Sequence, residues 1–321
     1  MSHLHRGLYV FAVLSCIYSI FFSTEAVAQF SRTSYPYLTQ HFIHPFSVNP
    51  AFVGDHSQPS VGVAFRSAPR LRVTNSNSGF AYVKGLVPSL NDGGIGVTFS
   101  YNNDEFQELY DRQMHLGLTA AYTFNLADLV ELKGGISAGF LRSNSNNNGL
   151  NPGLQNNEKR QKLNVDIGVM IDIPFVKIGV AMHHNNQPEF KFYSNASAVR
   201  YRNELFVTID GDIPIQNIFS IKPSIIAQME NQDMLTQFTL MGEYDDLVFL
   251  ALSYSQELDF NKDNNTTGFS AIDEFHPIRL TVGGKYARFL IAGTYGIPNA
   301  ENRSALFEFS LGYFLNEVDD Y

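Results

Sequence analysis

Strict alternation of apolar and polar residues is the feature that most constrains how this chain can fold. In residues 163–173 every odd-numbered residue is Leu, Val or Ile, while the even-numbered ones include Asn164, Asp166 and Asp172. Successive side chains of a β-strand point to opposite faces, so this pattern gives a strand with one apolar and one polar face. Helical spacing does not fit it. The sequence therefore predicts an all-β protein.

Fourteen segments of this kind follow one another along the chain. Each has about the length of a tilted strand that crosses a bilayer, roughly nine to eleven residues. They span 60–66, 78–86, 94–101, 115–124, 130–142, 163–173, 176–184, 201–213, 218–230, 234–244, 247–258, 278–286, 289–297 and 305–315.

The connections between these segments alternate between long and short. The long ones are 67–77, 102–112, 143–161, 185–200, 259–277 and 298–304; the short ones lie at 88–92, 125–128, 174, 214–217, 245–246 and 287–288, and only 231–233 breaks the rhythm. Tight periplasmic turns and longer external loops are typical of outer-membrane barrels. We therefore expect a transmembrane antiparallel up-and-down β-barrel of about fourteen strands. Both of its ends should lie on the periplasmic side.

The composition of the two faces favours a barrel in lipid over a soluble β-sandwich. One face is rich in Phe, Tyr, Leu, Ile and Val, and the other holds small residues with scattered charges. A lumen tolerates such charges, whereas a lipid-facing position does not. The charges expected inside are Lys133, Asp166, Lys177, Lys222, Arg279 and Lys285.

The N-terminus has the three parts of a secretory signal peptide. Arg6 precedes an apolar stretch that ends near Ser23, and 26–28 supplies a small-x-small cleavage site. We expect 1–28 to be removed, 29–57 to form a periplasmic pre-barrel or plug segment, and 58–321 to form the barrel. The alternative is a lipoprotein acylated at Cys16, but Leu14 fits that motif poorly.

Composition excludes several functions. Cys16 is the only cysteine, so the mature chain would contain no disulfide, no thiolate metal site and no cysteine nucleophile. The net charge of −9 gives no electrostatic attraction for nucleic acid. We find no local catalytic motif and expect no enzyme activity, no cofactor and no metal.

Two features of the sequence are candidates for a metal site. His183 and His184 are adjacent, which in a strand would put them on opposite faces and suit one metal poorly. Residues 259–265 imitate the start of a calcium loop but lack its glycine, and Ser270 stands where the bidentate Glu belongs. An oxygen-rich external loop can still hold calcium weakly, so loop 259–277 is either a weak calcium site or a solvated loop.

The stretch 44–54, His-Pro-Phe-Ser-Val-Asn-Pro-Ala-Phe-Val-Gly, resembles the PorP/SprF family associated with type IX secretion in Bacteroidetes. Gly-Gly-Ile-Gly-Val at 93–97, Ile-Lys-Pro-Ser at 221–224 and Glu-Phe-Ser-Leu-Gly-Tyr at 308–313 resemble the same family, so the similarity covers nearly the whole mature chain. The family's Arg-Asn-Gln-Trp after the first strand is reduced to Arg66 and Ser67-Ala68-Pro69, and six further residues follow the last strand.

The resemblance implies an outer-membrane accessory that docks, exports or anchors a partner with a C-terminal sorting domain, such as a surface or gliding adhesin. Other secretion-system components and outer-membrane lipid would be further partners. The expected partner contacts are Asn49, Pro50, Ala51, Phe52 and Gly54, together with loops 143–161 and 259–277. The alternatives are a passive channel or small-solute transporter, and then a lipid-modifying enzyme.

Overall fold

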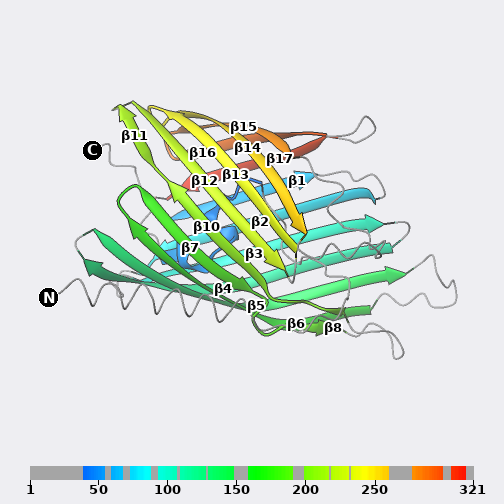
Figure 1. Cartoon of the computed structure of the whole chain (residues 1–321). Coiled ribbons are helices and arrows are strands. Elements are labelled where there is room, and N and C mark those ends of the chain that lie inside the picture. Colours follow the sequence, from blue (N-terminus) through cyan, green and yellow to red (C-terminus); the bar gives the residue numbers. More distant parts are fainter. Residues whose placement is uncertain are drawn as a thin grey trace. The chain divides into compact units, whose positions relative to one another are not determined.

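The architecture is an antiparallel β-barrel, seen here in a computed structural model (Figure 1). The structure describes residues 39–54, 59–67, 73–87, 93–106, 109–127, 129–147, 158–190, 199–216, 218–230, 233–259, 277–298 and 305–315. The expected signal peptide, 1–28, lies outside these ranges.

Fourteen strands close the barrel, and all neighbouring pairs are antiparallel. They are β1 (Ser60–Ser67), β2 (Val73–Leu86), β3 (Gly93–Phe106), β4 (Leu109–Ala127), β5 (Val130–Asn147), β6 (Glu158–Ile173), β7 (Val176–His183), β10 (Glu204–Gly211) with β11 (Ile213–Gln216), β12 (Phe219–Glu230), β13 (Asp233–Tyr244), β14 (Val248–Asp259), β15 (Ile278–Tyr286), β16 (Phe289–Ile297) and β17 (Leu306–Phe314). Sequence neighbours pair along the wall, and β1 pairs with β17. β7 pairs with β10 past the short excursion that contains β8 and β9, and β10 and β11 both pair with β12. The fourteen predicted segments are confirmed.

β10 and β11 form one barrel strand with an interruption at Asp212. The register with β12 runs from Asp210 opposite Ser224 to Ile213 opposite Ile221, so Pro223 stands opposite Gly211, the last residue before the break. Proline has no backbone N–H to donate to the ladder, which explains the interruption at this point.

Several strands continue beyond the expected ends. β3 reaches Phe106 and β4 begins at Leu109, although the sequence predicted a long loop over 102–112. β5 and β6 likewise extend into the loop predicted at 143–161. These extensions are mostly polar in sequence and show no regular apolar alternation, and the strands continue because their backbone groups still pair across the ladder.

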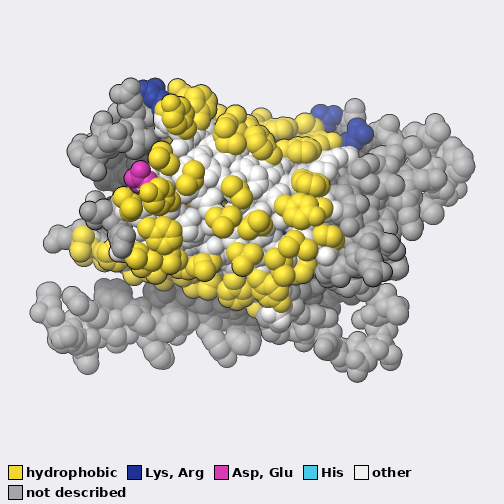
Figure 2. All heavy atoms as spheres, turned by 90° about the horizontal axis from the view of Figure 1, so that it is seen from above, with side chains coloured by type: hydrophobic (Ala, Val, Ile, Leu, Met, Phe, Trp, Pro, Cys, Tyr) yellow, Lys and Arg dark blue, Asp and Glu magenta, His cyan; other side chains and the backbone are white. Residues whose placement is uncertain are grey.

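The two faces of the wall differ as the alternation predicted. The outward side chains are large and apolar and are about half exposed, and on the face seen in Figure 2 the charged groups lie only at the edges of the apolar area. On the inner face Lys133, Asp166 and Arg279 are buried. Lys177 pairs with Asp172, and Lys222 and Lys285 both pair with Glu243. Each inward charge thus lies among polar partners instead of lipid.

No helix within the described ranges is long and apolar enough to cross a membrane.

The two kinds of connection distinguish the two ends of the barrel. β1 begins and β17 ends at the edge that carries the short turns, so both ends of the barrel lie at the same edge. We call this edge the short-turn end and the opposite one the long-loop end.

Candidate functional site

Residues 39–54, here called the inner segment, lie inside the barrel. The segment contains two 3-10 turns, η1 (Pro45–Ser47) and η2 (Pro50–Gly54). Its hydrogen-bond partners stand on β4, β6, β12, β13, β16 and β17, which surround it on all sides. Almost every residue of the segment is buried. The lumen is therefore occupied at this level.

A buried carboxylate on β17 holds the start of the segment. Glu308 accepts hydrogen bonds from Thr39 N (2.9 Å), Thr39 Oγ1 (2.8 Å) and Gln40 N (2.9 Å). Gln40 Nε2 also donates to Thr294 Oγ1 on β16. Hydrogen bonds to a charged acceptor are stronger than neutral ones, so this carboxylate fixes two consecutive residues to the wall.

His41 is held by a polar network on β12, β13 and β15. Gln237 donates from Nε2 to Thr39 O (3.0 Å) and faces His41 Nδ1 at 3.4 Å, while its Oε1 accepts from Arg279 Nη1 (2.9 Å). Ser224 donates to Asp210, so its oxygen is left to accept from His41 Nε2 at 3.2 Å. The partners thus specify a neutral imidazole protonated on Nε2. Burial, and secondarily the positive charge of Arg279, lowers the pKa of His41 to about 3.

His44 is the second buried histidine of the segment. Within the described ranges neither of its ring nitrogens has a hydrogen-bond partner, and its ring meets Tyr82 of β2 edge to face, with centroids 5.7 Å apart. Burial lowers the pKa of His44 to about 4. Both histidines are therefore neutral while the segment is seated.

Asn49 and Pro50 start the second turn by a local rule. Asn49 Oδ1 accepts from Ala51 N at 2.9 Å, which is the capping bond of a helical turn, and Pro50 fills the first position, where no donor is needed. Asn49 Nδ2 donates to Val169 O of β6 at 3.1 Å. One side chain thus shapes the turn and attaches it to the wall.

Inward-facing glycines of the wall form the surface on which this turn lies. A Cβ at Gly94 would stand 2.3 Å from Val53 O, one at Gly135 2.5 Å from Ala51 N, and one at Gly168 2.1 Å from Asn49 Oδ1. A Cβ at Gly179 would stand 2.8 Å from Asn49 Nδ2. We call Gly94, Gly135, Gly168 and Gly179 the glycine seat. They lie on β3, β5, β6 and β7, near the short-turn end, and they let backbone approach backbone more closely than any side chain would allow.

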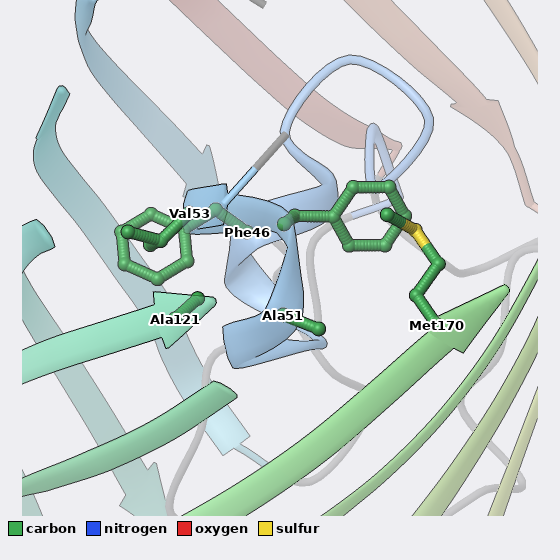
Figure 3. Close-up of a cluster of buried hydrophobic side chains, with 6 residues drawn as sticks. Phe46, Ala51, Val53, Ala121 and Met170 are labelled. Atoms are coloured by element: carbon green, nitrogen blue, oxygen red, sulfur yellow. The ribbon is translucent and has the colours of Figure 1, made fainter. Parts of the chain in front are cut away.

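Apolar contacts complete the seat. Phe46, Ala51, Phe52 and Val53 form one buried cluster with Ala121 of β4 and Met170 of β6. Figure 3 shows Ala121 and Met170 pointing from the wall toward the segment. Phe52 O also lies 3.5 Å from Lys84 Nζ, and Thr123 Oγ1 donates to Gly54 O at 3.0 Å. The apolar half of the segment is therefore fixed mainly by shape.

The residues expected to contact a partner are brought together by this arrangement. Asn49, Pro50, Ala51, Phe52 and Gly54 are consecutive parts of the seated turn and are buried. Sequence reasoning did not identify the glycine seat or the partners Glu308, Gln237 and Arg279. The only available signal was that glycines recur on the inner face of neighbouring strands, and it does not reveal what they contact.

At the long-loop end a second segment folds inward. β8 (Glu189–Phe190) pairs with β9 (Val199–Arg200), and Phe190 and Tyr201 are buried against Leu141 of β5. Asn186 continues the ladder of β6 with its side chain, donating to Leu163 O and accepting from Val165 N. We call residues 184–190 and 199–203 the inward loop.

His183 and His184 correct one expectation. Both are buried, whereas a continuous strand would have placed them on opposite faces. β7 ends at His183, and His184 has φ 55°, which turns its ring inward to Asn164 Oδ1 (2.6 Å from Nδ1). His183 Nε2 lies 2.7 Å from Val48 O of the inner segment. His184 also packs against Tyr201, so these two residues link the inner segment to the inward loop.

The chemistry available at this site is packing and hydrogen bonding. No group of three or more His, Cys, Asp or Glu among the described residues is arranged to hold a metal ion. Loop residues 148–157 and 260–276, which include most of the calcium-like stretch and His276, lie outside the described ranges.

Comparisons with known proteins agree with this architecture. Residues 30–313 match the family model described as type IX secretion system membrane protein PorP/SprF. No curated protein sequence matches the chain.

Among solved structures, the chain is similar to a TodX monoaromatic hydrocarbon channel deltaS2 mutant, with 9% identity, a TM-score of 0.53, and coverage of 83% of this chain and 92% of that one. It is also similar to a Pseudomonas aeruginosa FadL homologue, with 10% identity, a TM-score of 0.50, and coverage of 84% and 93%. At such identities these likenesses concern the fold alone.

Proposed function

The chain belongs to the PorP/SprF family of type IX secretion system membrane proteins, and we propose that it docks, exports or anchors one partner protein in the outer membrane. The partner class is a secreted or surface protein with a C-terminal sorting domain, and the barrel would work beside other components of the secretion system. In this role the barrel is a platform for a protein and not a route for solutes.

The occupied lumen is the observation that carries this proposal. The inner segment is hydrogen-bonded to opposite walls, through Glu308 on one side and Asn49 on the other. The inward loop adds the buried cluster of Leu141, Phe190 and Tyr201 at the long-loop end. A solute would have to displace both segments. We therefore propose that the inner segment is a plug.

The proposed partner contacts are loops 143–161 and 259–277 and the turn from Asn49 to Gly54. The turn is covered while it occupies the glycine seat, so a partner that binds it must compete with the wall. We infer that partner binding and seating of the plug are coupled.

Deleting the gene tests the main proposal. One specific cargo should then remain inside the cell while other cargoes reach the surface, because only the dedicated partner loses its platform. A pull-down from detergent-solubilised outer membranes should recover the same cargo. Normal surface display of every cargo in the deletion strain would contradict the proposal that the barrel serves one partner.

A passive channel is the second candidate, supported by the likeness of the barrel to the structures named as hydrocarbon channels. Purified protein in a planar bilayer separates the two functions. Stable ohmic current steps favour a channel, whereas the absence of current at the same protein density favours the docking role.

A further inference from the structure

The lipid-facing wall has a hollow that spans β15, β16, β17 and β1, with Gly293 of β16 in its lining. Its outward lining consists of Phe65, Leu280, Val282, Tyr295, Phe307 and Phe309, and its volume is about 370 Å³. The backbone of Thr294 and Glu308 forms part of its floor, because the side chains of these two residues point inward to the inner segment. The wall at this place separates lipid from the plug by the thickness of one backbone.

At Gly293 the part of the hollow nearer the short-turn end has no side chain to fill it. A Cβ at Gly293 would meet no atom within 4 Å, although Val282 and Phe309 stand opposite it on the two neighbouring strands. Its lining extends from Gly293, in the middle of β16, to Ser67 and Phe307, at the long-loop ends of β1 and β17. If the long loops are external, the hollow opens in the half of the wall that faces the outer leaflet.

We propose that the hollow binds one acyl chain of an outer-leaflet lipid. It is continuous with the apolar outer face, so hydrocarbon is the medium that borders it. A void among apolar side chains loses dispersion contacts on every side, and a flexible hydrocarbon chain restores them. Aromatic rings on three neighbouring strands give the chain rigid walls. Ser67 and Tyr295 place polar atoms toward the rim, where the head of the lipid would lie.

Native mass spectrometry of the detergent-extracted barrel is the first test. The protein should retain one lipid through delipidation, and Gly293→Leu, which fills the hollow, should reduce the retained fraction at least tenfold. Gly134→Leu is the matched control, because Gly134 also faces outward with nothing within 4 Å of a Cβ. The same loss in both variants, a bound mass that is not a lipid, or no retained lipid in the unmodified protein would overturn the proposal.

A sole tryptophan gives a second readout that does not depend on extraction. The chain contains no Trp, so Tyr295→Trp reports on the hollow and Tyr254→Trp, on an outward-facing position of β14, reports on ordinary lipid contact. In vesicles of phosphatidylethanolamine and phosphatidylglycerol with brominated chains, quenching at position 295 should saturate at a several-fold lower brominated fraction than at 254. Adding Gly293→Leu should make the two curves coincide. Coinciding curves without that substitution would contradict the proposal.

Heat-modifiable gel mobility shows in each case that the barrel has folded.

Discussion

The two halves of the inner segment are held in different ways. Thr39 to His41 are fixed by hydrogen bonds to Glu308, Gln237 and Ser224, with a full charge at the first of these. Residues 46–54 lie on glycines and apolar side chains, and their hydrogen bonds to the wall are single contacts at Val48, Asn49, Phe52 and Gly54. The first half depends on charge and protonation, the second on the absence of side chains from the wall.

This difference shows that shape can fix the position of a segment inside a polar lumen while hydrogen bonds to ionisable groups make its stability there depend on pH. Shape complementarity at the glycine seat gives a single position, since a Cβ at Gly94 or Gly135 would overlap the backbone of the segment and one at Gly168 or Gly179 the side chain of Asn49. The hydrogen bonds of the polar half involve ionisable groups, so their contribution to seating depends on pH. We therefore expect the two halves to respond to different perturbations.

Adding a side chain to the seat should have the largest effect. Gly135→Val places methyl groups where Ala51 N and Pro50 O now lie, at 2.5 and 2.6 Å from the new Cβ. Overpacking against backbone should cost the seated state about 3 kcal/mol or more. The rate at which a soluble maleimide labels Ser47→Cys should rise by about a hundredfold.

Gly134→Val is the control, because residue 134 lies next to 135 on β5 but faces outward into open space. It should leave the labelling rate unchanged. Equal labelling in the two valine variants would show that the seat does not hold the segment.

Removing the charge of Glu308 should have a smaller effect, confined to the polar half. Glu308→Gln keeps the shape but weakens the acceptor for Thr39 and Gln40, at a cost of about 2 kcal/mol. Hydrogen exchange of the amides at 39 and 40 should accelerate by roughly thirtyfold. Amides around Phe52 should keep their protection; if they lose it equally, the halves are not independent.

Mild acid should act on the same half and by less. The pKa values of His41 and His44 fall from 6.5 to about 3 and about 4 on burial, so the unseated segment binds protons that the seated one excludes. Seating is therefore unaffected above pH 6.5 and weakens as pH falls through 6.5 toward those values. Between pH 7.5 and 6 the loss should be about 1 to 2 kcal/mol for the pair. Hydrogen exchange should show it at residues 39–44, and the double variant His41→Gln with His44→Gln should remove the pH dependence.

The sequence predicts the wall far better than its contents. Alternation such as that of 163–173 reports directly which side of a strand meets lipid, because the bilayer imposes an apolar face. The mostly polar extensions at 102–106 and 143–147 escape this signal, because water does not require an apolar face on a strand. The position of His184 is not predicted by alternation, because β7 ends at His183 and His184 has a left-handed backbone conformation.

The course of 39–54 is set by tertiary contacts alone. Asn49 and Pro50 predict a local turn, and that turn is present. No local pattern reveals that Gly135 and Gly168, more than eighty residues away, form part of the glycine seat on which the turn lies. The inward charges were predictable as lumen residues, but the pairing of Glu308 with Thr39 joins residues 269 positions apart.

A disulfide between the segment and the wall tests the central claim that residues 39–54 occupy the lumen. A Cβ at Gly54 would stand 3.2 Å from Ala121 Cβ, so a small outward shift of the segment gives the roughly 3.5–4.5 Å that separates bridged cysteines. The natural sequence has one cysteine, Cys16, in the expected signal peptide, so in a chain from which 1–28 have been removed Gly54→Cys with Ala121→Cys offers one possible bridge. In oxidised cells nearly all of the folded protein should yield the linked peptide by mass spectrometry, while Gly54→Cys with outward-facing Tyr122→Cys should not. Free thiols in both pairs would contradict the account.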